Sequence, residues 1–278
     1  MKSKGRYRGT LQYLYAHGPL YLTLYGGVVA LLIGMGLAAQ RGWLAFVPLA
    51  LAFMIIVLYF LLASLWAAHH LFDPGGLQPH HVLFDMAQLR ETDDFAFVAL
   101  HGRSQAIELG RRLTTGQIAV LDVYNPQLNP SRVLARARSH TVSLSGSDPR
   151  FVWRNGSISL LPLPNESVTA VILLQTLSQF PQKGDCEVLL KEVRRILIPG
   201  GRVLLAERVR TQNNWLALGP AALSLETAQQ WRDLLRRAGF IVRNEQNLAG
   251  LIHCLRADKP IPIEAQQMQL DLRLTSDE

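Results

Sequence analysis

The sequence predicts an α/β domain, built on a doubly wound and mainly parallel sheet, that follows a helical hairpin long enough to cross a membrane. Two observations lead to this expectation. Two long uncharged apolar runs lie near the N-terminus, and after residue 93 short apolar strands alternate with amphipathic helices. Continuous apolar strands separated by helices are typical of parallel sheets that are covered on both faces.

The two apolar runs cover residues 19–39 and 43–68 and contain no charged side chain. A hydrocarbon core about 30 Å thick needs roughly 20 helical residues, so each run is long enough to span it. The connector 40–42 is short, which predicts a tight antiparallel pair. A secretory signal is disfavoured, because its apolar core is only about 7–15 residues long and a cleavage site follows it, whereas here a second run follows at once.

The charge distribution bears on both function and orientation. Residues 1–72 carry five basic residues and no acid, which leaves 23 of the 28 basic residues and all 21 acids for 73–278. A nucleic-acid-binding protein concentrates its basic excess on the folded part, so that class is disfavoured. Four of the five basic residues precede residue 9, and the positive-inside tendency therefore places the N-terminus in the cytoplasm. We expect a two-pass protein of the cell inner (cytoplasmic) membrane, with the large domain also cytoplasmic and the lipid bilayer as its partner.

The first run also repeats small residues at every fourth position: Gly26, Ala30, Gly34 and Ala38. At helical spacing they form one smooth stripe, which permits close contact with the second helix or with an integral-membrane partner. The alternative is that glycine and alanine are simply common in membrane helices.

We expect four parts: a basic arm with the hairpin at 1–72, a linker at 73–93, an α/β domain at 94–257 and a tail at 258–278. Two histidine pairs lie in or beside the linker, His69-His70 and His80-His81. No carboxylate or cysteine stands at convincing ligand spacing from them, so we expect no metal site. The two cysteines, Cys186 and Cys254, are too few for a disulfide scaffold.

The pattern predicts a Rossmann-like sheet of seven strands. The expected strands are 94–100, 117–124, 151–154, 167–174, 202–208, 240–245 and 251–256. The expected helices are 104–113, 131–139, 186–197 and 227–238. In such sheets the ligand lies at the carboxyl ends of the strands, near the point where the strand order reverses.

One block, 161–208, carries a specific signature. Its elements are Leu161-Pro162-Leu163, Glu166-Ser167-Val168, the run from Glu192 to Leu197, and Pro199-Gly200-Gly201. In order and spacing it resembles class I S-adenosylmethionine-dependent methyltransferases of the quinone/sterol type (methyltransferase type 11). Most of these residues shape the fold, because Pro199 ends a helix and the glycines permit the positive φ of a turn.

The resemblance implies S-adenosylmethionine as cofactor, and it assigns residues to its site. The family places a glycine-rich turn after the first strand, which falls here on Gly102, Ser104 and Ala106. Its acid at the end of the second strand, which accepts hydrogen bonds from the ribose hydroxyls, corresponds to Asp122. The other expected cofactor contacts are Ser157, where the family has an acid near the adenine amine, and Gln175, just after the long apolar strand.

The chain departs from the family pattern at several of these positions. Of the three turn glycines only Gly102 remains, and the acid two residues before it is replaced by Leu100. Loss of a charge-assisted hydrogen bond forfeits about 1.5–3 kcal/mol. Asp122 is compatible both with ribose binding and with an ordinary turn-capping role. No residue is identified as catalytic, and His253 is expected to be structural.

Three functions remain open. The first is a membrane-tethered methyltransferase that acts on a lipid-soluble or membrane-proximal acceptor. The second is a catalytically inactive methyltransferase-like subunit that serves as scaffold or accessory protein of a membrane complex. The third is a domain that binds a different nucleotide, with Arg103 facing its phosphate.

Overall fold

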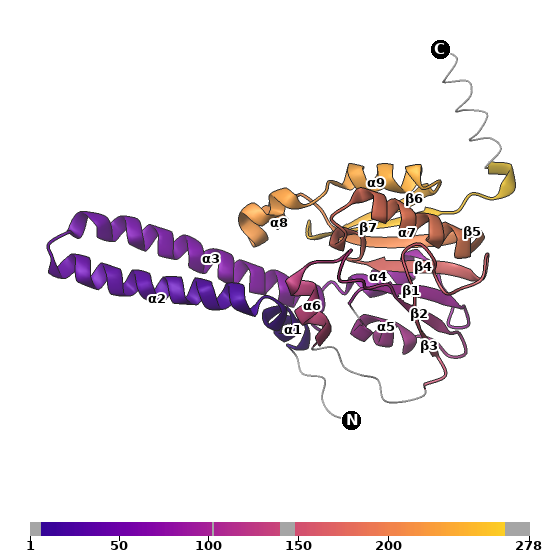
Figure 1. Cartoon of the computed structure of the whole chain (residues 1–278), viewed down its shortest axis with the longest axis horizontal. Coiled ribbons are helices and arrows are strands. Elements are labelled where there is room, and N and C mark those ends of the chain that lie inside the picture. The colour runs from indigo at the N-terminus through magenta and orange to yellow at the C-terminus, as the bar shows by residue number, and fades with distance from the viewer. Residues whose placement is uncertain (1–6, 102, 140–147, 265–278) are drawn as a thin grey trace, which may run out of the picture. The chain divides into compact units, whose positions relative to one another are not determined.

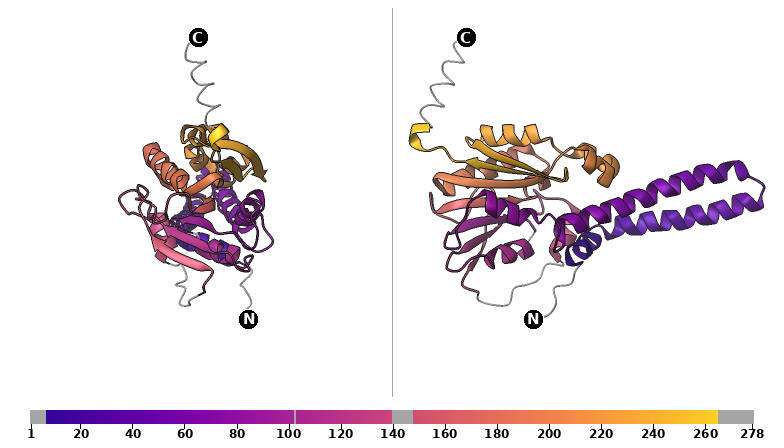
Figure 2. Two further views of the ribbon diagram at one scale, coloured as in Figure 1. Left: turned by 90° about the vertical axis from the view of Figure 1, so that its right-hand side faces the viewer. Right: turned by 180° about the vertical axis from the view of Figure 1, so that it is seen from behind.

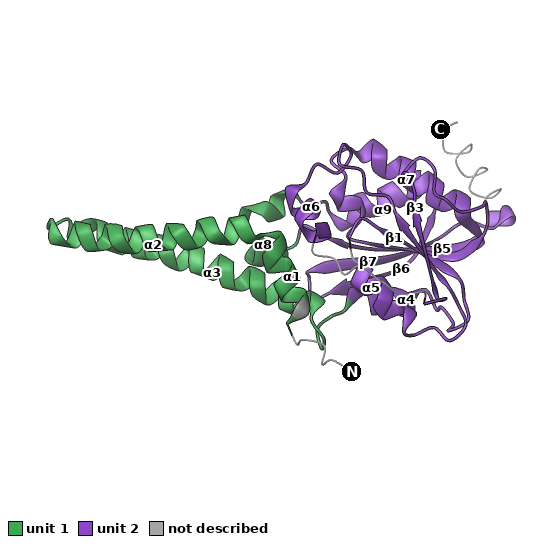
Figure 3. Cartoon of the chain, turned by 60° about the horizontal axis from the view of Figure 1, so that its bottom comes forward, with its two compact units in different colours: residues 1–78, 211–224 green, residues 79–210, 225–278 purple. Residues whose placement is uncertain are grey.

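The computed structural model describes residues 7–101, 103–139 and 148–264 (Figure 1). The chain forms two compact units (Figure 3). Unit 1 comprises Met1–Gln78 together with Thr211–Ser224, and unit 2 comprises Pro79–Arg210 and Leu225–Glu278.

The regular elements of unit 1 within the described residues are all helices. Its elements are α1 (Arg8–Ala16), α2 (Gly18–Gln40), η1 (Leu44–Phe46), α3 (Val47–Phe72), α8 (Gln212–Leu218) and η3 (Gly219–Ser224). Two stretches, Gly18–Gln40 and Leu44–Phe72, are long and apolar enough to cross a membrane, and none of their most apolar windows is buried inside the protein. Proline stands in the first turn of both α2 and α3, where its missing N–H costs nothing.

The face of α2 that is partly buried differs from the predicted small-residue stripe. The partly buried positions recur every three or four residues: Tyr21, Leu24, Val28, Leu31, Met35 and Ala38. A Cβ added at Gly26 or Gly34 would meet nothing within 4 Å. Of the stripe, only Ala38 shares the partly buried face, and the second helix does not cover Gly26 or Gly34. The larger side chains decide the packing because they bury more apolar area.

Helix α1, which the sequence analysis did not predict, depends on a buried carboxylate that is distant in sequence. Asp73, fully buried, accepts hydrogen bonds from the backbone N–H of Gly9 (2.6 Å) and Thr10 (3.2 Å) and from the Thr10 hydroxyl. It also pairs with Nδ1 of His69 at 2.8 Å. Burial raises the pKa of Asp73, but the bonds from Thr10 and His69 outweigh this and hold the pKa below its ordinary value. Asp73 thus supplies the N-terminal cap that α1 lacks locally.

Replacing this carboxylate should loosen α1. We expect Asp73→Ala to lower the free energy of unfolding in detergent micelles by about 2 kcal/mol or more, because several charge-assisted bonds to one buried group are lost together. Thr10→Val, which removes only the hydroxyl contact, should cost clearly less. Circular dichroism during denaturant titration measures both, and an Asp73→Ala variant as stable as the parent would contradict the assignment.

Unit 2 is built on one seven-stranded sheet, as predicted. Its order is β3-β2-β1-β4-β5-β7-β6, with only β7 antiparallel to its neighbours. The strands are β1 (Phe95–Ala99), β2 (Ile118–Asp122), β3 (Phe151–Asn155), β4 (Val168–Leu174), β5 (Leu197–Arg208), β6 (Ile241–Leu248) and β7 (Ile252–Asp258). This is the doubly wound class I topology.

Helices cover both faces of the sheet (Figures 2 and 3). On one face lie α7 (Lys183–Ile196) and α9 (Ala228–Arg237); on the other lie α4 (Pro79–Met86) and α5 (Arg103–Gly110). Helix α6 (Arg132–Ser139) lies at the carboxyl ends of the strands, where its Arg138 contacts Leu100 and Asp122. A short 3-10 turn, η2 (Leu177–Gln179), follows β4. Helix α9 begins at the predicted position, because Thr227 and Gln230 form a capping box. Helix α4 lies within the stretch that was expected to be a linker.

The Pro199-Gly200-Gly201 motif forms a bulge at the start of β5. Val168 pairs with Leu197, and Ala170 pairs with Arg202, so the residues between them leave the ladder. Gly200 has φ +72°, which only glycine adopts without strain. The strand therefore starts five residues earlier than predicted, at the end of α7.

Candidate functional site

The carboxyl ends of β1, β2, β4 and β5 meet at one edge of the sheet. The strand order reverses between β1 and β4, which is where ligands bind in open α/β sheets. The β1–β2 register places Ala99 opposite Asp122, so the end of β2 lies beside the turn that follows β1.

Asp122 is saturated by hydrogen bonds from the protein itself. Its Oδ1 accepts from the Tyr124 backbone N–H (3.1 Å) and from Nη1 of Arg138 (3.0 Å). Its Oδ2 accepts from Nη2 of Arg138 (2.7 Å) and from Nη2 of Arg103 (3.0 Å). A carboxylate offers about four acceptor positions, so all of them are in use.

Arg138 bridges the ends of two strands. Besides its bidentate pair with Asp122, its Nη1 donates to the carbonyl oxygen of Leu100 at 2.5 Å, and its guanidinium lies 4.2 Å from the centre of the Tyr124 ring. Burial opposes ionisation of Asp122, but the bonds from Arg138, Tyr124 and Arg103 outweigh it and lower the pKa of this carboxyl. Asp122 is therefore charged and tightly held.

The charge of Arg103 is paired with the carboxylate of Asp122. Its ion pair with Asp122 at 3.0 Å and its position 5.6 Å from the centre of the Trp153 ring account for its orientation. The hypothesis that Arg103 faces a nucleotide phosphate gains no support from this arrangement.

Three buried polar atoms at this edge have no hydrogen-bond partner among the described residues. They are Nδ1 of His101 after β1, Nε2 of Gln175 after β4, and Oε2 of Glu207 near the end of β5. Gln175 also has φ +48°, which is strained for a residue with a Cβ. Buried polar groups are normally satisfied, so their concentration at the ends of neighbouring strands marks a place for a polar ligand or water.

Two of these groups have strongly shifted pKa values. Burial, with a smaller contribution from the charge of Arg138, lowers the pKa of His101 to about 4, so this imidazole is neutral at pH 7. Burial raises the pKa of Glu207 to about 7, although hydrogen bonds from Ser178, Leu177 and Thr176 oppose the rise.

Glu207 was missed by the sequence analysis, which treated it only as part of a strand. It is fully buried, and its Oε1 accepts a hydrogen bond of 2.7 Å from the backbone N–H of Leu177. It therefore holds the turn after β4 in place. The sequence does contain a signal that could have identified Glu207, because it is an acid within an apolar strand, near the strand's carboxyl end.

The remaining predicted cofactor residues are less informative. Ser104 contacts Gln105, Ala106 is buried inside α5, and Ser157 is exposed and pairs with Ser159. Gly102 lies outside the described residues. Leu100, which replaces a family acid, is fully buried. The structure thus brings Asp122 and Gln175 to the ligand edge, and the cofactor contact of Ser157 stays a prediction.

A histidine cluster lies away from this edge. Ligand atoms of His80, His81 and Glu108 lie within 4.8 Å of one another, and Nε2 of His80 is 3.1 Å from a Glu108 carboxylate oxygen. This contact joins α4 to α5, and the expectation of no metal stays a prediction.

Comparison with known proteins identifies the domain. Residues 104–205 match the family model described as "Methyltransferase domain". The match covers less than half of the chain, and the sheet of unit 2 has the class I methyltransferase fold. The match indicates S-adenosylmethionine as the cofactor. No curated protein matches the chain.

Solved structures agree on the fold. A SAM-dependent methyltransferase from Aquifex aeolicus is 14% identical, with a TM-score of 0.51 over 67% of this chain and 94% of that one. The cyclase SpnF is 18% identical, with a TM-score of 0.50 over 66% of this chain and 80% of that one. One fold thus serves a methyltransferase and a cyclase, so the reaction must be argued from the site.

The residues fit the cofactor, provided that one side chain moves. Asp122 lies at the position that the family resemblance assigns to the ribose acceptor, and Nε2 of Gln175 has no hydrogen-bond partner among the described residues. Both Asp122 oxygens, however, are already taken by Arg138, so ribose hydroxyls bind there only after this guanidinium leaves. When bound, S-adenosylmethionine supplies an activated methyl group, and the protein's part is alignment and exclusion of water.

The pKa of Glu207 predicts a pH-dependent stability. Its pKa is about 7 when folded against an ordinary value of 4.5, so folding favours the protonated form. This stabilisation is complete below about pH 4.5 and is lost as pH rises through about 7, a change on the order of 3 kcal/mol.

Glu207→Gln keeps the shape but does not ionise, so its Tm should fall less than that of the parent between pH 5 and pH 8. Glu187→Gln is the control, because this side chain is 38% exposed, and its profile should match the parent. Parallel profiles for parent and Glu207→Gln would show that Glu207 does not titrate in this range.

Proposed function

We propose that this protein is a membrane-tethered S-adenosylmethionine-dependent methyltransferase that acts on a lipid-soluble or membrane-proximal acceptor. The methyltransferase domain supports the reaction class, and the two apolar helices support the tether. A hydrophobic acceptor that is dissolved in the bilayer stays in the same membrane to which the enzyme is tethered. This confinement favours such a substrate over a freely soluble one.

The proposed topology follows from the charges at the N-terminus. Four basic residues precede the first span, and one, Arg41, lies in the turn between the spans. The tendency of basic residues to remain on the cytoplasmic side puts the N-terminus there. Two crossings return the chain to the same side, so the methyltransferase domain is cytoplasmic at the inner membrane.

The position of Asp122 is the observation that carries the proposal. Its carboxylate ends β2 beside the turn after β1, as a ribose acceptor requires, and it is ionised. Arg138 is the competitor for this carboxylate. It comes from α6, is 23% exposed, and can reorient without a change in the sheet.

Calorimetric titration of the full chain in nanodiscs with S-adenosylhomocysteine tests this competition. We expect Arg138→Ala to bind more tightly than the parent, by up to about tenfold, because two acceptor positions on Asp122 become free without displacement. Asp122→Asn should weaken binding by about tenfold or more, because a charge-assisted acceptor is lost.

Arg132→Ala is the matched control, since it removes the same charge from an exposed position on the same helix. It should leave the affinity unchanged. Equal affinity for the parent, Arg138→Ala and Asp122→Asn would exclude Asp122 as the ribose acceptor.

The second candidate function is that of a catalytically inactive subunit of a membrane complex. The saturation of Asp122 and the buried Leu100 in place of a family acid favour it. Gly26, Ala30 and Gly34 are exposed on α2, and an integral-membrane partner helix is the proposed occupant. Absence of S-adenosylhomocysteine binding in every variant, Arg138→Ala included, would favour this second function over the first.

A further inference from the structure

The segment Thr211–Ser224 follows β5 in sequence but packs with the hairpin in unit 1 (Figure 3). No charged residue occurs between Arg210 and Glu226. The segment forms α8 and η3, a short helix followed at once by a 3-10 turn. An uncharged helical segment that packs on a candidate membrane span can be surrounded either by water or by lipid.

Its contacts fix it against the middle of α3. The rings of Trp215 and Phe60 meet edge to face, with centroids 6.3 Å apart. At Gly219 an added Cβ would come within 3.1 Å of the Phe60 ring, and its φ of +60° also favours glycine. The turn between α8 and η3 therefore lies directly on Phe60.

Phe60 is far from the end of the span. It precedes Phe72, the last residue of α3, by 12 residues, which is about 18 Å along a helix. It precedes residue 68, where the apolar run ends, by 8 residues, or about 12 Å. Half of a hydrocarbon core about 30 Å thick is about 15 Å, so a segment held at this height beside a spanning helix lies inside the leaflet.

The outer surface of the segment suits that position. Trp215, Leu216 and Leu223 are 46%, 47% and 61% exposed. In a water-soluble protein, large apolar side chains are more often buried in the interior. The backbone is helical, and the Thr211 hydroxyl accepts the Asn214 N–H at 3.2 Å as a cap. Internally satisfied backbone is what a bilayer requires of any segment that enters it.

We propose that Thr211–Ser224 is a membrane-embedded segment whose Trp215, Leu216 and Leu223 side chains contact the lipid acyl chains of the leaflet that faces unit 2. The proposal rests on the membrane tethering proposed above. Only Val209 and Arg210 separate the segment from β5, whose carboxyl end belongs to the ligand edge. In sequence, the segment thus follows almost directly on the ligand edge.

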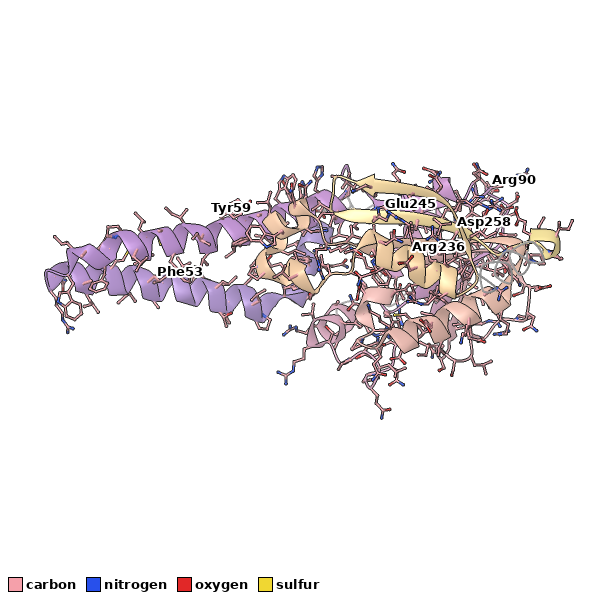
Figure 4. The ribbon with its side chains drawn as sticks, turned by 90° about the horizontal axis from the view of Figure 1, so that it is seen from above. Phe53, Tyr59, Arg90, Arg236, Glu245 and Asp258 are labelled. Carbon is pink, nitrogen blue, oxygen red and sulfur yellow. The ribbon has the colours of Figure 1, made fainter. Side chains whose placement is uncertain are left out.

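Spin-label accessibility tests the proposal on the full chain in phosphatidylcholine liposomes. Single cysteines are introduced as Leu216→Cys and Leu223→Cys, with Phe53→Cys on α3 as the membrane reference and Leu160→Cys on unit 2 as the water reference. Phe53 and Leu160 are 58% and 66% exposed, so all four labels are tolerated, and Figure 4 marks Phe53 on the hairpin. Native Cys186 and Cys254 are buried, and burial raises the pKa of each thiol to about 12, so the parent should take up no label.

We expect labels at 216 and 223 to collide with oxygen more than with a water-soluble nickel chelate, as at 53, and a label at 160 to show the reverse. Labels at 216 and 223 that behave like 160, while 53 remains in lipid, would overturn the embedded segment and leave the tether standing. A label at 53 that is accessible to nickel would overturn both.

Discussion

The carboxylate of Asp122 accepts four hydrogen bonds, and the properties of the candidate site depend on which groups donate them. Arg138 supplies two and Arg103 supplies one. Through its further bond to the Leu100 carbonyl, Arg138 ties the end of β1 to the end of β2. In the function proposed above, the ribose of the donor takes the acceptor positions that Arg138 now holds, so binding requires this guanidinium to move.

Besides Asp122, the carboxyl edge of the sheet has buried polar groups that could bind a ligand. His101, Gln175 and Glu207 each present a buried polar atom without a partner among the described residues, and they follow or end three adjacent strands. Such groups cost free energy unless something binds them. Burial also lowers the pKa of His101 to about 4 and raises the pKa of Glu207 to about 7. Shifts of this size are frequent at functional sites. The same fold in a methyltransferase and in a cyclase makes these local features, and not the topology, the basis for assigning chemistry.

The sequence predicted the parts of this protein that depend on local pattern. Buried parallel strands such as β4 are continuous apolar runs, and Thr227 caps the N-terminus of α9. The bounds of both elements were therefore predicted to within one residue. Features that depend on distant residues were not predicted. Helix α1 is capped by Asp73, 64 positions away in the bond to Gly9, and Thr211–Ser224 packs on the hairpin through contacts with α3 that include the Phe60 ring.

The candidate site divides along the same line. Asp122 was found because a strand-end acid is a local signal, whereas Arg138 lies 16 residues later on another element and was not suspected. The small-residue stripe on α2 was assigned a packing role, yet Gly26 and Gly34 are uncovered, because the larger side chains on another face make the contact with α3.

The most direct test of this account is a pair of experimental structures of the full chain, with and without S-adenosylhomocysteine. The account predicts that the ligand-bound form has both ribose hydroxyls within hydrogen-bond distance of the Asp122 carboxylate, with Arg138 moved away from it. A bound nucleoside with Arg138 still bidentate on Asp122, or no density at this edge at saturating ligand, would contradict it.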